Sequence, residues 1–158
     1  MHTKTLYMET TQVASSKSAA EITQVLVAAG ARQIAADYSQ AGDITGLRWM
    51  MIVQGVPVLF QMPTRTDPIY QILRKRRKGY FSNSDQAKLQ LQAERVAWRQ
   101  LLRWVQAQAA MIATGMVEAG EVFAPYIVSL DGKTLWQELT ETRFKAIAAP
   151  TEPRNQSQ

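Results

Sequence analysis

Residues 84–116 read SDQAKLQLQAERVAWRQLLRWVQAQAAMIATGM, and this stretch decides the fold. It contains no proline, and its first glycine is Gly115, so it can form one long helix. At about 100° per residue, its apolar side chains fall on two roughly opposite sides. Because a helix that is apolar on two sides is usually buried between other elements, the stretch predicts a central helix on which the rest of the chain packs.

The two apolar sides of this helix are predicted to have different members. The first side carries Leu91, Trp98, Leu101, Leu102, Val105, Ala109, Ile112 and Met116. The second side carries Leu89, Ala93, Val96, Trp104 and Met111. Val96, Trp104 and Met111 could form a homodimer interface, although burial in the chain's own core is the favoured alternative.

A polar ridge separates the two apolar sides. We define the ridge as Lys88, Gln92, Arg95, Arg99, Arg103 and Gln106; four of these six residues are basic and none is acidic. From 88 to 103 the ridge covers about 22 Å of helix, at about 1.5 Å per residue. Phosphates on one DNA strand are about 7 Å apart, so such a line could make about three or four phosphate contacts.

The densest charge lies just upstream, in the run Arg74–Lys78 (RKRRK). The formal net charge is +5 and the run holds five positive charges, so the rest of the chain sums to zero. A local basic cluster on a neutral body is the footprint of a partner that is nucleic acid, an anionic surface or an acidic protein. Tyr80 and Phe81 lie between the run and the ridge, where an exposed ring could stack on a base.

The remaining sequence predicts short elements around the central helix. We expect a strand at 4–10, then a helix capped by Ser16 or Ser18 with Glu21 in its first turn and Gly30 at its end. Three segments with β-prone residues, separated by turn residues, predict an antiparallel meander over 32–38, 44–54 and 56–62.

A second helix should begin at Thr66 or Asp67 and run through the basic run to residue 78, with Pro68 in its first turn. Ser82 or Ser84 caps the central helix. A short extended piece at 127–130 precedes a final amphipathic helix that is capped by Thr134 and carries Leu135, Trp136, Leu139, Phe144 and Ile147.

Together these segments predict an α+β fold. A small antiparallel sheet of three or four strands packs against a long central helix with two or three shorter helices. Residues 1–149 are expected to form a single domain, and 150–158, which are polar with two prolines, a disordered tail. No apolar run approaches the ~20 residues that span a bilayer, and no secretory signal is recognised, so we expect a cytoplasmic protein without membrane contact.

Residue types limit the chemistry. The chain has no cysteine and one histidine, His2, which excludes zinc sites and Cys/His nucleophiles. We therefore expect no catalytic residue, no metal and no cofactor. Two alternatives remain. Glu94 could be a buried acid or base, although pairing with an arginine or capping a neighbouring element is favoured. Glu118, Glu121 and Asp131 could bind Mg²⁺, although solvated loop acids are the favoured interpretation.

Four short motifs carry a resemblance. Residues 93–99 (AERVAWR), 104–108 (WVQAQ), 122–126 (VFAPY) and 131–135 (DGKTL) resemble a family of small conserved proteins encoded by phages, prophages and other mobile genomes. The resemblance runs from about residue 5 to 148. That family has no assigned activity, so the resemblance implies only a context in the host-cell cytoplasm, as a DNA-metabolism accessory or an inhibitor of host machinery.

The sequence thus favours a non-enzymatic nucleic-acid-binding accessory protein. The expected contacts are Arg74, Lys75, Arg76, Arg77, Lys78, Lys88, Arg95, Arg99 and Arg103 to phosphates, with Tyr80 or Phe81 stacking on a base. The alternative is a protein-interaction module, an inhibitor or adaptor, that uses the same basic face on an acidic partner. An enzyme is the third hypothesis and would need Glu94, Glu118 or Glu121 to converge in a cleft.

Overall fold

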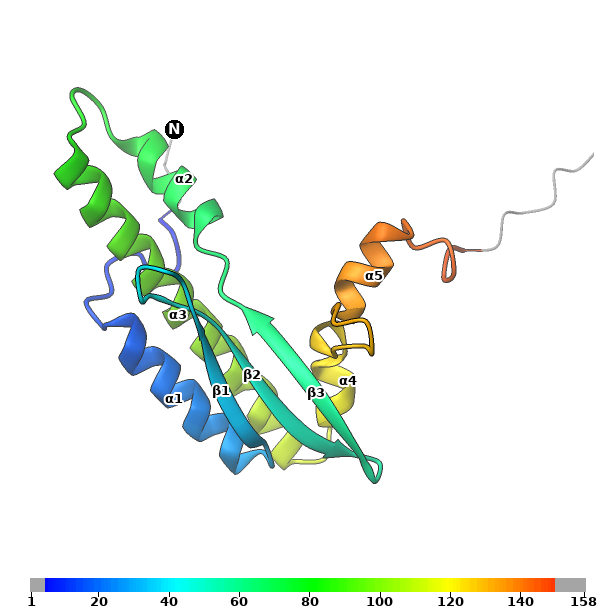
Figure 1. Cartoon of the computed structure of the whole chain (residues 1–158). Coiled ribbons are helices and arrows are strands. Elements are labelled where there is room, and N and C mark those ends of the chain that lie inside the picture. Colours follow the sequence, from blue (N-terminus) through cyan, green and yellow to red (C-terminus); the bar gives the residue numbers. More distant parts are fainter. Residues whose placement is uncertain (1–4, 150–158) are drawn as a thin grey trace, which may run out of the picture.

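The computed structural model describes residues 5–149 and shows an α+β arrangement, as the sequence predicts (Figure 1). A three-stranded antiparallel sheet packs on a long central helix, α3, with shorter helices around it. In chain order the elements are α1 (Ser15–Ala28), β1 (Arg32–Tyr38), β2 (Ile44–Val53), β3 (Val56–Pro63), α2 (Asp67–Arg76), α3 (Asn83–Ala113), α4 (Ala119–Val122), the 3-10 turn η1 (Ala124–Tyr126) and α5 (Leu135–Glu141).

The sheet is the predicted meander, in the order β1-β2-β3. β2 and β3 pair without interruption from Gly46 opposite Pro63 to Val53 opposite Val56. Gly55 takes the positive φ of +80° that the tight turn between them requires. A single bridge between Phe60 and Ile127 extends the sheet beyond β3, at the short extended piece that the sequence predicts.

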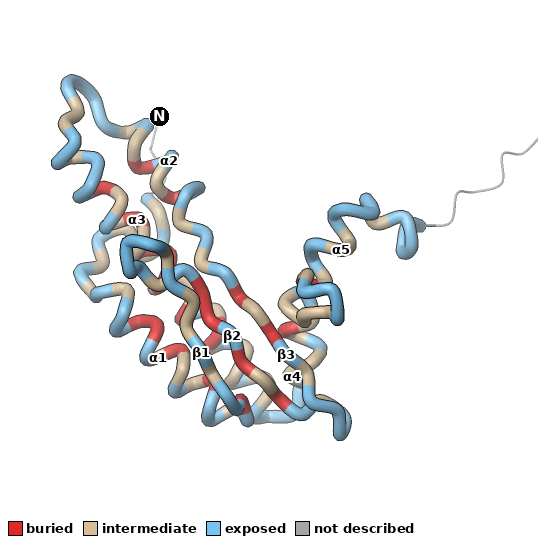
Figure 2. The backbone as a smooth tube through the Cα atoms, viewed as in Figure 1, coloured by how far each residue is buried: buried red, intermediate tan, exposed pale blue. Residues whose placement is uncertain are grey.

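Helix α3 is apolar on two sides because it separates two cores. On one side it packs with α1 against the sheet, where Trp98, Leu102 and Val105 are fully buried (Figures 1 and 2). On the other side it packs against α2. That second core comprises Ile69, Leu73, Leu89, Ala93, Val96 and Ala97. The prediction of a helix buried on two sides is confirmed.

Three details of the α3 prediction are wrong. Leu91 is 46% exposed, because α1 begins at Ser15 and an open hollow remains beside the early turns of α3. Met116 is 70% exposed, since the helix has already ended at Ala113. Trp104 packs with the sheet-side core rather than with α2, and its ring contacts the edge of Phe123.

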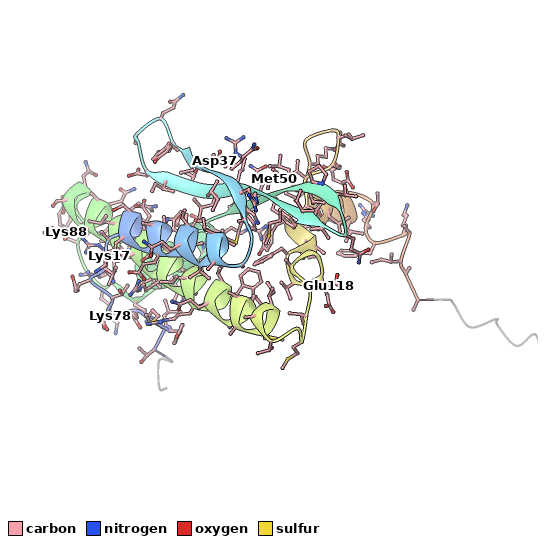
Figure 3. The ribbon with its side chains drawn as sticks, turned by 90° about the horizontal axis from the view of Figure 1, so that it is seen from below. Lys17, Asp37, Met50, Lys78, Lys88 and Glu118 are labelled. Carbon is pink, nitrogen blue, oxygen red and sulfur yellow. The ribbon has the colours of Figure 1, made fainter. Side chains whose placement is uncertain are left out.

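The sheet face away from α1 and α3 is open in the described part of the chain. Ile52 and Leu59 on that face are 57% and 43% exposed. Figure 3 places Met50 and Asp37 on this side of the sheet, and Asp37 forms an ion pair of 2.7 Å with Arg48.

The N-terminal segment is not the predicted strand. Within 5–10 the chain turns at residues 7–10, and it lies along α3, where the Gln92 side chain donates hydrogen bonds to the carbonyl oxygens of Glu9 and Thr11. Leu6 packs on the α2-side core, so this apolar side chain is buried without a strand. We call residues 6–11 the N-terminal strap.

The first helix begins earlier than predicted. Its N-cap is Ala14, whose methyl group cannot accept a hydrogen bond, and Ser18 is fully buried and in contact with Arg99 of α3. Glu21 consequently lies beyond the first turn. The predicted C-terminal glycine is confirmed: Gly30 has a φ of +104°, and the Ala31 amide bonds to the Leu26 carbonyl at 2.9 Å, as in a Schellman motif.

The later helix boundaries are partly confirmed. Ser82 caps α3 in a reciprocal capping box with Asp85, and Thr134 caps α5. However, α2 ends at Arg76, so Arg77 and Lys78 are not helical, and α5 ends at Glu141, before Phe144 and Ile147. The predicted tail at 150–158 lies outside the described residues. Among the helices described, none has the length and apolar character to cross a membrane.

The two cores give a direct stability test. Leu102→Ala should lower the free energy of unfolding by about 2–5 kcal/mol, because it leaves a cavity in the fully buried sheet-side core. Leu91→Ala, the same change on the same helix, should cost less than about 1 kcal/mol because Leu91 is 46% exposed. Urea unfolding measures both, and equal losses would contradict the packing described for α3.

Candidate nucleic-acid interface

The polar ridge of α3 is largely covered by other parts of the chain. Its central residue, Arg99, donates from Nη1 to Glu21 Oε2 of α1 at 2.8 Å and to Ser18 Oγ at 3.5 Å. The Arg99 side chain is only 14% exposed. Helix α1 therefore covers this part of the ridge, and Arg99 holds α1 against α3 instead of facing a partner.

The neighbouring ridge residues are also engaged or half-buried. Gln92 is bonded to the N-terminal strap, and Arg95 lies beside Glu94 and Asp43 in the hollow at the start of α1. Only Lys88 and Arg103 of the four predicted basic contacts on the ridge are classed as exposed. They lie fifteen residues apart on α3, about 22 Å along its axis. The structure therefore does not place the four together as one exposed line.

The acids of the last helix, Glu138 and Glu141, bond to residues outside the ridge. Glu138 accepts a hydrogen bond from Ser129 Oγ, and Glu141 forms an ion pair with Lys133 at 2.6 Å. Both belong to α5, which projects from the other side of the molecule (Figure 1).

The basic run, in contrast, gathers at a projecting tip. We define the α2–α3 tip as residues 74–88: the end of α2, the connector and the first turns of α3 (Figure 1). It holds six basic residues and one acid, Asp85, so its formal charge equals the +5 of the whole chain. Basic residues in the last turn of α2 are favoured by the negative end of the helix dipole.

Side chains at the tip differ in exposure. The exposed basic residues are Lys75, Arg77, Lys78 and Lys88. Tyr80 is 94% exposed, whereas Phe81 is half-buried and packs against the α2-side core. The Arg74 guanidinium lies 4.1 Å from the centre of the Phe81 ring, so Phe81 fixes Arg74 and is not available for stacking on a ligand. Of the two aromatic candidates, only Tyr80 projects into solvent.

The carboxylate nearest this charge in the sequence has a structural role. Asp85 Oδ2 accepts hydrogen bonds from Ser82 Oγ at 2.6 Å and from the Ser82 amide at 3.0 Å. These hydrogen bonds hold the pKa of Asp85 below its ordinary value, and the positive charges of Lys88 and Arg77 lower it further. Asp85 is thus ionised at neutral pH and occupied by the cap.

Glu9 is a member of this site that sequence reasoning missed. It comes from the N-terminal strap and pairs with Arg76, Oε1 to Nη1 at 2.5 Å. The hydrogen bond from Arg76 and a second one from the Leu6 amide lower the pKa of Glu9. No local pattern could have found this pair, because 67 residues separate its members.

A hollow beside the tip collects several of these groups. It has a volume of about 330 Å³ and is lined by Glu9, Leu73, Arg76, Arg77, Lys88, Leu89 and Gln92. Figure 3 shows Lys78 and Lys88 at the same end of the molecule, opposite to Glu118. Three cations against one carboxylate leave the hollow positive, so it can accept an anionic group such as a phosphate.

The acids considered for catalysis or metal binding do not converge. Glu94 accepts a hydrogen bond from Gln90 Nε2 at 3.2 Å, and Glu118 accepts one from Gln54 Nε2 at 3.3 Å. Glu121 accepts one from the Glu118 amide at 3.3 Å, at the start of α4. Within residues 5–149, no group of three or more histidine or acidic side chains is arranged to hold a metal ion.

Comparison with known proteins adds no relative to this picture. No family model, curated protein or solved structure matches the chain.

The strap contact predicts a pH dependence. The pKa of Glu9 is lowered in the folded protein. The stabilisation of the strap by ionised Glu9 is therefore complete above the ordinary carboxyl pKa, and it is lost as pH falls through the lowered pKa. Amide hydrogen-exchange protection of residues 6–11, corrected for intrinsic rates, should therefore fall in acid. In the Glu9→Gln variant, protection of residues 6–11 should already be weaker at neutral pH and should show no further fall in acid. A variant whose protection depends on pH as in the wild type would contradict the role of Glu9.

Proposed function

We propose that the protein is a non-enzymatic nucleic-acid-binding accessory and that it holds single-stranded nucleic acid at the α2–α3 tip. The observation that carries the proposal is the nearly complete exposure of Tyr80 between exposed cations on both sides in the sequence. An exposed aromatic ring costs hydration free energy, whereas stacking on an unpaired base recovers contact for it.

The surrounding charges suit a phosphate backbone. Arg77, Lys78 and Lys88 are long, exposed side chains, and within the described residues no ion pair ties any of them to an acid. They can therefore neutralise phosphates and release the counterions condensed on the strand. Arg99, which α1 covers, and the half-buried Arg95 drop out of the proposed contact set, and Phe81 keeps only the role of supporting Arg74.

The phage or mobile-element context stays a prediction from the sequence motifs. An acidic protein is the alternative partner for the same cations. Binding of an acidic protein would not require Tyr80 to stack on a base. The dependence of binding on base stacking by Tyr80 therefore separates the two hypotheses.

The first test removes charge from the tip. Fluorescence anisotropy with labelled oligothymidylate at several salt concentrations should show binding that weakens with salt. The triple variant Lys75→Gln, Arg77→Gln, Lys78→Gln should reduce the slope of log affinity against log salt by about two, at about 0.7 per lost single-strand contact. Arg103→Gln, an exposed cation away from the tip, is the matched control and should leave the slope unchanged.

The second test removes the ring. Tyr80→Ala should weaken oligothymidylate binding by about 5- to 100-fold, the value of one stacked base, and Tyr80→Phe should restore it. Tyr38→Ala removes a tyrosine that is 63% exposed on the sheet and should have no effect. Failure of the wild-type protein to bind at low salt would refute the proposal. Unchanged affinity in Tyr80→Ala would favour generic charge attraction or an acidic partner.

A further inference from the structure

A second pocket lies at the opposite end of α2 from the tip. It has a volume of about 380 Å³, within the usual range for small-molecule sites. Its lining comes from the end of β3, the connector to α2, the start of α2, the middle of α3 and η1, and includes Thr64, Arg65, Ile69, Gln100, Trp104 and Tyr126. The proposed function makes no use of these residues.

The walls of this pocket suit a flat, apolar face. Trp104 and Tyr126 pack edge to face, with ring centres 5.9 Å apart and planes at 73°. Trp104 is fixed further by Phe123, whose ring centre lies 5.7 Å away. Ile69 and Leu101 add aliphatic surface. A preformed aromatic wall of this kind favours a planar ring, since the wall loses little conformational entropy when the ring binds.

The polar groups of the pocket suit a ligand with a hydrogen-bonding edge and a negative charge. The Thr64 hydroxyl is buried and has no hydrogen-bond partner within the described part of the chain. The Gln100 Nε2 group donates a hydrogen bond to the Tyr7 carbonyl oxygen at 2.8 Å, which leaves the amide oxygen of Gln100 as an acceptor. Arg65 is exposed and forms no ion pair with any described acid. A buried hydroxyl without a partner is costly, and a small movement of the Thr64 side chain toward the pocket would let a ligand satisfy it.

We infer that this pocket binds a nucleobase, with the adjoining phosphate on Arg65. A nucleobase combines the two requirements, because its faces are apolar and flat while its edge carries donors and acceptors. The inference rests on the proposed function, in that the base belongs to the strand that the tip holds. A free nucleoside monophosphate has the same chemistry, and the experiment separates the two sources.

The tip hollow and the pocket are two separate hollows that both border helices α2 and α3. Ile69 lines the pocket and Leu73 and Arg76 line the tip hollow, all on α2; on α3 the corresponding residues are Gln100 and Gln92. The ten residues of α2 measure about 15 Å, or about two phosphate steps of a DNA strand. The N-terminal strap crosses between the two sites, held by Gln92 and Gln100, so a strand of a few nucleotides would pass over it.

The experiment uses a labelled pentathymidylate and variants in which one nucleotide at a time is abasic. Two abasic positions should each weaken binding by about 5- to 100-fold, one for Tyr80 and one for the pocket. In Thr64→Val with Arg65→Gln, the penalty at the pocket position should shrink while the Tyr80 penalty remains. Arg32→Gln, an exposed arginine on β1, is the matched control and should leave both penalties unchanged.

Saturation-transfer NMR with thymidine monophosphate tests the pocket without the tip. Saturation should pass from the protein to the base protons of the nucleotide. The inference is supported if this transfer is lost in the Thr64 and Arg65 double variant and kept in Tyr80→Ala. If only one abasic position matters and Tyr80→Ala removes it, the pocket inference is refuted while the proposed function stands. If the pentanucleotide does not bind, the proposed function fails; monophosphate transfer would then identify a free-nucleotide site, and its absence would refute the inference as well.

Discussion

A helix of 31 residues with two apolar sides has to be buried on both, and the other elements are arranged accordingly. The sheet and α1 cover one side, and α2 with the N-terminal strap covers the other. Because α2 and α3 are consecutive and antiparallel, their junction must project beyond both cores. The densest positive charge of the chain lies at this junction, at a point that little of the described chain covers.

The same constraint explains why the polar ridge is structural. Elements that cover the two apolar sides also reach the narrow stripe between them. Its long polar side chains then serve as hydrogen-bond donors to these elements: Gln92 to the strap and Arg99 to α1. A basic residue on a central helix is therefore ambiguous in a sequence, because it can equally hold a neighbouring element or meet a partner.

Most of the fold could be predicted from local patterns. β1 has the predicted bounds, and turn residues, the capping pair Ser82 and Asp85 and the glycine after α1 act over a few positions. The errors arose where distant contacts decide. Leu6 joins a core built from α2 and α3, and Glu9 pairs with a residue 67 positions away. The start of α1 was missed for a different reason: its N-cap is Ala14, so no capping side chain marks it. The pocket beside Trp104 brings together residues from three separate stretches of the chain, 63–69, 97–104 and 126, so no local motif could predict it.

Arg99 holds the fold together whereas Arg77 is available to a ligand, and a paired substitution tests this difference most directly. Arg99→Gln should lower the free energy of unfolding by about 1–2 kcal/mol, between the values for exposed and buried ion pairs, and leave oligothymidylate affinity unchanged. Arg77→Gln should do the reverse, with stability within about 0.5 kcal/mol of wild type and weaker, less salt-dependent binding. If Arg99→Gln reduced affinity as much as Arg77→Gln without a loss of stability, the ridge would be the interface and this account would be wrong.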